Sequence, residues 1–209
     1  MDKKLSSLYR LGGLTGILSG FLMLASSIWF IFDLSSISSL SPDLGKIGIF
    51  HGIGVVTTLL LVPTLLAGYG LLSSEASSRS ILGASFAIPW IIIELIAHCS
   101  QTAPLNSLSE LAGAPTAAIG TSLYELWAEW GEALFMTGAF LCALLLLCYG
   151  SALHSWGNSI ASYLFFFSII AFPVGLFLDL GVQLHVLIRG IAFLFLGGIL
   201  VQAPYEDEV

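Results

Sequence analysis

Residues Leu126–Tyr149 read LWAEWGEALFMTGAFLCALLLLCY, a stretch long and apolar enough to cross a lipid bilayer as a helix. A spanning helix needs about 20 mostly apolar residues, because the hydrocarbon core is about 30 Å thick and each residue adds about 1.5 Å. Inside lipid the backbone must satisfy its own hydrogen bonds, and the stretch lacks the alternation of a barrel strand. It therefore predicts a transmembrane helix.

Five further stretches of this kind occur along the chain, so we expect six spans in a single transmembrane domain of residues 1–209. Their approximate bounds are Leu11–Phe32, Ile47–Leu72, Ile81–Ala97, Ile160–Leu178 and Val186–Gln202. The segments between them are rich in Ser, Gly and Asn, which favours solvated loops. We expect these loops at Asp33–Lys46, Ser73–Ser80, Cys99–Glu125, Gly150–Ser159 and Asp179–His185, with one helical turn at Ser107–Ala112. The predicted fold class is an all-α integral membrane bundle.

The overall composition supports this interpretation. Hydrophobic residues make up 57% of the chain, charged residues only 9%, and the mean hydropathy is +0.98. Soluble domains average about 25% charged residues, so a soluble domain and a disordered chain are both excluded. The net charge of −7 offers no basic surface, and we expect no nucleic-acid partner. The expected partner is the lipid bilayer of a cell membrane, crossed several times, while the oligomeric state stays open.

The basic residues predict how the bundle is oriented. With six spans both termini lie on one side, together with Lys3, Lys4, Arg10 and Arg79, whereas Lys46 lies on the other. Loops on the cytoplasmic side of membrane proteins carry an excess of Lys and Arg. We therefore expect both termini in the cytoplasm.

The polar residues inside or beside the spans gather at the extracytoplasmic end of this arrangement. Ionisable groups inside a bilayer are costly and usually mark function. We expect these residues to share a pocket, with the deeper Trp90 as a further lining residue. The candidate pocket residues are His51, Trp90, Glu94, His98, Glu129, Glu132, His185 and Arg189.

Helical spacing sharpens the expectation of a shared pocket. Glu94 and His98 are four residues apart, as are His185 and Arg189, so each pair shares a helix face. Glu129 and Glu132 continue an acidic stripe that begins at Glu125. Arg189 is the deepest cation and cannot deprotonate. We expect it to pair with a carboxylate, either Glu132 or Glu94.

Several chemistries fit such a cluster. Imidazoles and carboxylates bind divalent metals, which makes His51, His98 and His185 candidate metal ligands. Two of these histidines could also ligate a haem, a less favoured reading because the ligands must oppose each other across a gap. A proton relay through Glu and His, an arginine that holds the acidic head of an amphiphile, and a purely structural ion-pair network stay open as well.

Four segments of the chain resemble a known family. They are RLGGLTGILSG (10–20), LLVPTLLAGYGLL (60–72), IIIEL (91–95) and GEALFMTGAFLCALLLLCYGSAL (131–153). Together they resemble a family of bacterial six-span inner-membrane proteins that is defined as a domain of unknown function. The resemblance implies an all-helical bundle, brings no established activity, and assigns no functional residue.

Three functional hypotheses follow from the sequence. The first is a protein whose polar pocket binds or transports a small ion or an amphiphile. The second is a membrane-embedded, metal-dependent enzyme acting on a lipid-like substrate, and the third is an accessory subunit of a membrane complex. No nucleophile motif such as G-x-S-x-G is present. The sequence leaves open whether the chain is an enzyme.

Overall fold

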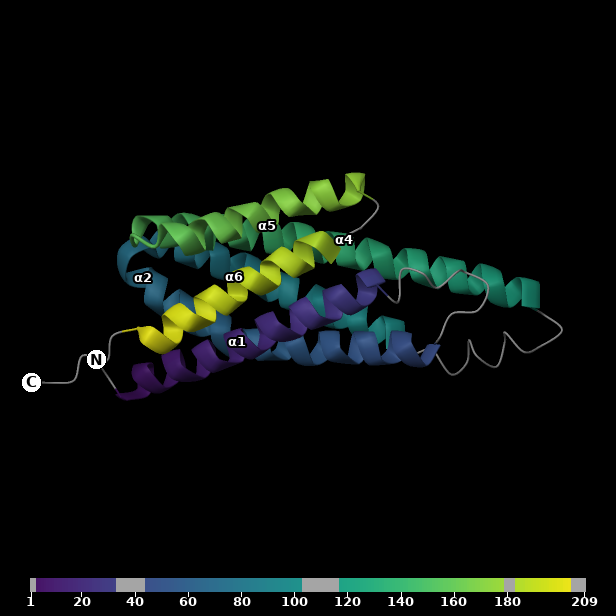
Figure 1. Ribbon diagram of the computed structural model, residues 1–209, viewed down its shortest axis with the longest axis horizontal. Coiled ribbons are helices and arrows are strands. Elements are labelled where there is room, and N and C mark those ends of the chain that lie inside the picture. Colours follow the sequence, from purple (N-terminus) through teal and green to yellow (C-terminus); the bar gives the residue numbers. More distant parts are fainter. Residues whose placement is uncertain (1–2, 33–43, 103–116, 179–182, 204–209) are drawn as a thin grey trace, which may run out of the picture.

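The computed structural model of the chain is an elongated bundle of helices (Figure 1). It describes residues 3–32, 44–102, 117–178 and 183–203, and within these ranges it contains no strand. The helices are α1 (Lys3–Phe32), α2 (Leu44–Thr102), α4 (Ala117–Ser155), α5 (Ser159–Phe177) and α6 (Gln183–Gln202). Because α2 folds back on itself, the bundle consists of six helical rods, and the prediction of an all-α architecture is confirmed.

The reversal of α2 takes place at a single residue. Ala76 has non-helical backbone angles (φ −141°, ψ 55°), and the rods Gly45–Ser74 and Ala76–Thr102 lie on either side of it. The expected break between these two spans is confirmed, but it is a kink at one residue and not a loop over Ser73–Ser80. The hydroxyl groups of Ser73 and Ser74 donate to backbone carbonyls three residues earlier, at 3.0 Å each, so these serines are accommodated within the helix.

Other helices also extend into segments expected as loops. Helix α4 begins at Ala117, inside the expected loop Cys99–Glu125, and it continues to Ser155. Only residues 156–158 separate it from α5, where the Asn158 side chain accepts a hydrogen bond from the backbone N–H of Ala161 at 3.1 Å. The predicted helical turn at Ser107–Ala112 lies outside the described residues.

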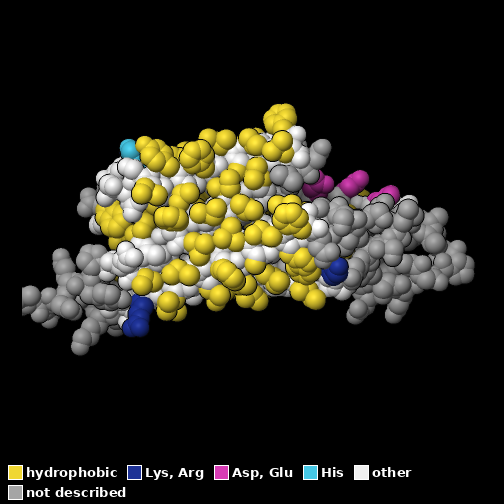
Figure 2. Space-filling view, viewed as in Figure 1, with side chains coloured by type: hydrophobic (Ala, Val, Ile, Leu, Met, Phe, Trp, Pro, Cys, Tyr) yellow, Lys and Arg dark blue, Asp and Glu magenta, His cyan; other side chains and the backbone are white. Residues whose placement is uncertain are grey.

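Length and composition make five of the rods candidate membrane spans. They are Ser6–Phe32, Gly45–Ser74, Ala76–Thr102, Glu125–Ser155 and Gln183–Gln202, and the shorter apolar segment Ser159–Gly175 belongs to α5. Figure 2 shows hydrophobic side chains covering the middle of the surface, with charged groups near the ends. A polytopic helical membrane protein presents this kind of surface to lipid.

Glycines bring α1 and α6 into close contact. A Cβ atom on Gly197 would lie 2.7 Å from the carbonyl oxygen of Gly13, and one on Gly190 would lie 3.0 Å from that of Gly20. Gly16 also packs against α6, with a Cβ there 3.2 Å from the Cα atom of Gly197. Small residues let membrane helices approach closely, so Gly16 and Gly20 serve helix packing.

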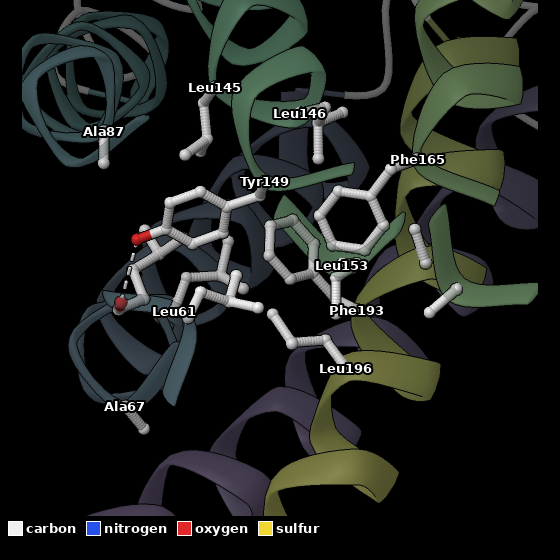
Figure 3. Close-up of a cluster of buried hydrophobic side chains, with 14 of the residues drawn as sticks. Leu61, Ala67, Ala87, Leu145, Leu146, Tyr149, Leu153, Phe165, Phe193 and Leu196 are labelled. Atoms are coloured by element: carbon white, nitrogen blue, oxygen red, sulfur yellow. Dashed lines mark hydrogen bonds between the residues drawn. The ribbon is translucent and has the colours of Figure 1, made fainter. Parts of the chain in front are cut away.

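The half of the bundle where α1 begins and α6 ends holds a continuous apolar core (Figure 3). The Tyr149 hydroxyl donates to the carbonyl oxygen of Leu65 at 3.2 Å, so its one polar group is satisfied there. We call this region the apolar core. Its largest fully buried members include Leu61, Leu145, Leu146, Tyr149, Leu153, Phe165, Phe193, Leu196 and Leu200.

Candidate functional site

A buried ion pair joins α2 to α6 in the other half of the bundle. The Arg189 guanidinium donates to Oε1 of Glu94 at 2.7 Å, and the two residues are only 4% and 6% exposed. Of the two partners that the sequence leaves open for Arg189, the structure therefore selects Glu94. A paired arrangement is expected, because an isolated charge away from water is costly.

Trp90 lies on the same face of α2 as Glu94, one helical turn away. Its indole N–H donates to Oε1 of Glu94 at 2.9 Å, and the Arg189 guanidinium lies 5.1 Å from the centre of its ring. A cation over an aromatic face is attracted by the ring quadrupole. Trp90 is fully buried and holds both partners of the ion pair in place.

Two histidines extend the cluster from Glu94 towards the end of the bundle. His98 Nε2 lies 3.6 Å from Oε2 of Glu94, and the Nδ1 atoms of His98 and His51 lie 3.1 Å apart. A neutral imidazole has one N–H and one acceptor nitrogen. We assign the N–H of His98 to Nε2, facing the carboxylate, so that His51 Nδ1 donates to His98 Nδ1.

The pair of histidines depends on two neighbours. A Cβ atom on Gly54 would overlap the imidazole ring of His98, so a glycine at this position makes room for the ring. The Phe135 ring stacks on His51 with centres 5.7 Å apart and meets His98 edge-on at 4.9 Å. The two imidazoles are thus held by packing as well as by hydrogen bonding.

His185 is also buried, but it has a different partner. Its Nδ1 lies 2.7 Å from the carbonyl oxygen of Ser168 on α5, and because a carbonyl only accepts, Nδ1 carries the proton. The other ring nitrogen, Nε2, has no hydrogen-bond partner in the part of the chain that the structure describes. The same is true of Nε of Arg189, one helical turn away.

These side chains border a cavity of about 60 Å³, which we call the polar cavity. Helices α1, α2, α4 and α6 all contribute to its wall. Its polar lining includes Ser26, Thr57, Thr58, Glu94, His98, Gln183, His185 and Arg189, and its apolar lining includes Met23, Phe50, Phe135, Ala139 and Val186. Trp90 and His51 lie behind this wall, in contact with Glu94 and His98 respectively.

Two of the expected pocket residues lie elsewhere. Glu129 and Glu132 are exposed on α4 and do not line the polar cavity. The opposite face of α4 is fixed against α2, because the Trp127 indole donates to the carbonyl oxygen of Ser100 at 2.9 Å and Gln101 donates to that of Trp127 at 3.2 Å. This contact turns the acidic stripe outwards, where Figure 2 shows acidic side chains near one end of the bundle.

The structure also bears on the metal-ligand hypothesis for His51, His98 and His185. It brings the first two together and directs His185 to Ser168 instead. Within the described ranges, no group of three or more His, Cys, Asp or Glu side chains is arranged to hold a metal ion. The geometry is that of a hydrogen-bonded polar cluster beside a cavity.

Sequence reasoning missed several lining residues that carry no charge. Thr57 and Thr58 are polar, and Gly54 shapes the site by having no side chain, while Ser168 lies outside the lining and holds His185. Gly54 and Thr58 lie three and seven residues after His51, so they share its helix face. That periodicity is the signal that could have identified them.

Comparison of the chain with protein-family models, with curated proteins and with solved structures finds no match in any of the three. The resemblance to the six-span inner-membrane family therefore stays a prediction.

Proposed function

We propose that this polytopic membrane protein binds a small ion, or the small polar head of an amphiphile, in the polar cavity. The observation that carries the proposal is a cavity bordered by a buried ion pair and two buried histidines inside an otherwise apolar bundle. Ionisable groups at this depth cost free energy unless they are paired, and in membrane proteins they usually mark ion or substrate sites. Membrane anchoring alone requires none of these groups.

The apolar core supports a site that is entered from one end. Leu61, Leu145 and Leu196 are fully buried in the half beyond the cluster, and the buried Glu, Arg and His side chains of the described residues all lie on the cluster's side of them. A ligand would enter from the end where α2 and α6 begin. On the orientation that the basic residues predict, this end is extracytoplasmic. Transport across the bundle would require the apolar core to open.

A thermal-shift panel tests the proposal on the purified full chain. Small anions, cations and neutral hydroxylic solutes are added separately, and we expect at least one class to raise the unfolding temperature through binding to the folded state. The increase should be smaller in the lining variants His98→Gln and Thr58→Val. It should be unchanged in Glu129→Gln, which alters an exposed group outside the cavity.

Two results would contradict the proposal. One is a panel in which no class stabilises the wild-type protein, which would leave the cluster with a structural role only. The other is an equal shift in all three variants, because the solute would then act outside the cavity.

A further inference from the structure

We infer that the ligand of the polar cavity is a small monocarboxylic acid, bound as a carboxylate together with one proton. The inference rests on the proposed function and adds a chemical class to it. Its basis is a pair of unpartnered polar atoms, Nε of Arg189 and Nε2 of His185, on two residues that line the same cavity.

The two atoms differ in hydrogen-bonding character. Arg189 Nε carries a hydrogen and can only donate. His185 Nδ1 already donates to the Ser168 carbonyl, so Nε2 of the neutral ring can only accept. A ligand that satisfies both must offer one acceptor and one donor, and a carboxylic acid offers a C=O and an O–H on the same carbon. Both residues are at least nine-tenths buried, at 4% and 0% exposure, and buried polar groups left unpartnered are costly.

Charge balance favours an acid over a free anion. Glu94 already neutralises Arg189, so a carboxylate that entered alone would leave one uncompensated negative charge in the bundle. A proton that entered alone on His185 would place a second cation one turn from Arg189. The carboxylate and the proton together leave the cluster neutral, so each favours binding of the other.

The chemical step is a proton transfer along one hydrogen bond. The acid O–H faces His185 Nε2, and its proton can pass to that nitrogen, which leaves a carboxylate between an imidazolium and the Arg189 N–H. The O–H bond breaks, an N–H bond forms, and no other co-reactant is needed. An amide of the same shape fits the two hydrogen bonds but cannot give up its proton in this way.

The other titratable groups around the cavity leave this role to His185. Helix α2 contributes His51, His98 and Glu94, which are joined to one another or to Arg189. On α4 the Cys142 side chain is fully buried, and α1 contributes Met23 and Ser26, neither of which titrates. On α5, Ser168 holds His185 through its backbone carbonyl.

The size of the cavity restricts the acid. A volume of about 60 Å³ accommodates roughly four water-sized groups, taking about 15 Å³ for each. Acetic acid has that number of non-hydrogen atoms, and formic acid has fewer. Long-chain acids would have to leave their chains outside the cavity.

Calorimetric titration of the full-length wild-type protein with sodium acetate tests the inference. Repeating the titration in buffers of different ionisation enthalpy gives the number of protons taken up per acetate bound. We expect one proton, and therefore an affinity that falls about tenfold for each unit increase in pH above neutrality. Acetamide is titrated in parallel as the isosteric ligand that cannot release its proton in this step.

Two variants accompany the wild-type protein. His185→Gln keeps a polar side chain but cannot take up a proton, so it should bind acetate at least tenfold more weakly and without proton uptake. His154→Gln is the matched control, because His154 is an exposed histidine near the C-terminal end of α4, and it should behave like the wild-type protein.

Acetate binding without proton uptake would overturn the inference, and so would acetamide binding as tightly as acetate. The wild-type titrations give these results even if His185→Gln does not fold. Stabilisation by cations or neutral solutes alone in the thermal-shift panel would also overturn the inference, while the proposed function would stand. An absence of stabilisation by any solute would overturn both.

Discussion

The two halves of this bundle are built from the same helices but differ in the kind of side chain that they bury. Around Tyr149 and Leu196 most buried side chains are apolar, the buried polar ones are uncharged, and the Tyr149 hydroxyl donates to a nearby carbonyl. Around Glu94 and Arg189 the helices instead enclose charge, three buried histidines and a cavity. The first half is close-packed and gains free energy from filling space, whereas the second leaves space open and contains buried groups that need partners.

The contrast indicates what each half is for. A half packed mainly with apolar side chains is the ordinary way for helices to associate. A polar half with unpartnered donors and acceptors is less stable than an apolar equivalent of similar volume would be. The buried charges therefore support the proposal of a binding site, and substitutions in the two halves should differ in a predictable way.

The largest expected effect is the loss of the buried ion pair. Arg189→Ala leaves Glu94 charged and without its main partner, and breaking a buried pair costs about 3–5 kcal/mol. Arg79→Ala removes an exposed arginine that donates to the Ser151 carbonyl and the Ser155 hydroxyl, and exposed charges contribute about 0–1 kcal/mol. Thermal unfolding of both variants in one detergent measures the difference, and equal unfolding temperatures would argue against a stabilising pair.

Truncation of a leucine should cost more in the apolar core than a comparable truncation at the cavity. Leu196→Ala opens a new void in a region with no exposure, at a cost of about 2–5 kcal/mol. Val186→Ala, on the same helix, enlarges a cavity that already exists and should cost about 1 kcal/mol or less. Chemical denaturation of the two variants checks the ranking, and the reverse order would mean that the polar half is the better packed one.

A pair of glycines in the first rod of α2 tests the packing of the histidines. Gly54→Ala forces the His98 ring to move and should destabilise the protein by about 1–3 kcal/mol. Gly52→Ala is the matched control, because a Cβ atom there meets nothing within 4 Å, and it should be neutral or stabilising by up to about 1 kcal/mol. If both substitutions were tolerated alike, His98 would not occupy the position described.

The smallest effect is expected on the acidic stripe of α4. Glu132→Gln changes an exposed group outside the cavity, so the free energy of unfolding should change by less than about 0.5 kcal/mol. Thermal unfolding next to the wild-type protein measures this, and a loss comparable to that of Arg189→Ala would assign Glu132 a buried partner after all.

The fold could be predicted from sequence because hydropathy reports what lipid requires of a helix. Helical rods are present at all six expected spans, and five of the rods have the length and composition of a membrane span, whereas the apolar segment of α5 is shorter. The ends of the rods could not be predicted, because serines such as Ser73 and Ser74 can stay within a helix when their hydroxyls donate to backbone carbonyls of the preceding turn. The cytoplasmic location of both termini stays a prediction.

The candidate site could be predicted only in part, for a geometric reason. Spacing along one helix brings Trp90, Glu94 and His98 to the same face, and this much can be read from the chain. The rotation of α4 about its own axis depends on the contacts of its Trp127 with Ser100 and Gln101 of α2. The sequence therefore could not predict that Glu132 points outwards. The unpartnered atoms of His185 and Arg189 likewise emerge only from the packed structure.

The most direct test of the account is the accessibility of single cysteines from each side of the membrane. Ala139→Cys lines the polar cavity and Ala152→Cys lies in the apolar core, each in a background with Cys99, Cys142 and Cys148 replaced by alanine. Silver ion, a small probe that reacts with thiols, is applied to one side of sealed vesicles. The protein is then denatured, and the fraction of the introduced cysteine that silver protects from alkylation is measured. We expect silver to block Ala139→Cys from one side only and Ala152→Cys from neither. Block of Ala139→Cys from both sides, or from neither, would contradict a polar cavity that opens at one end of the bundle.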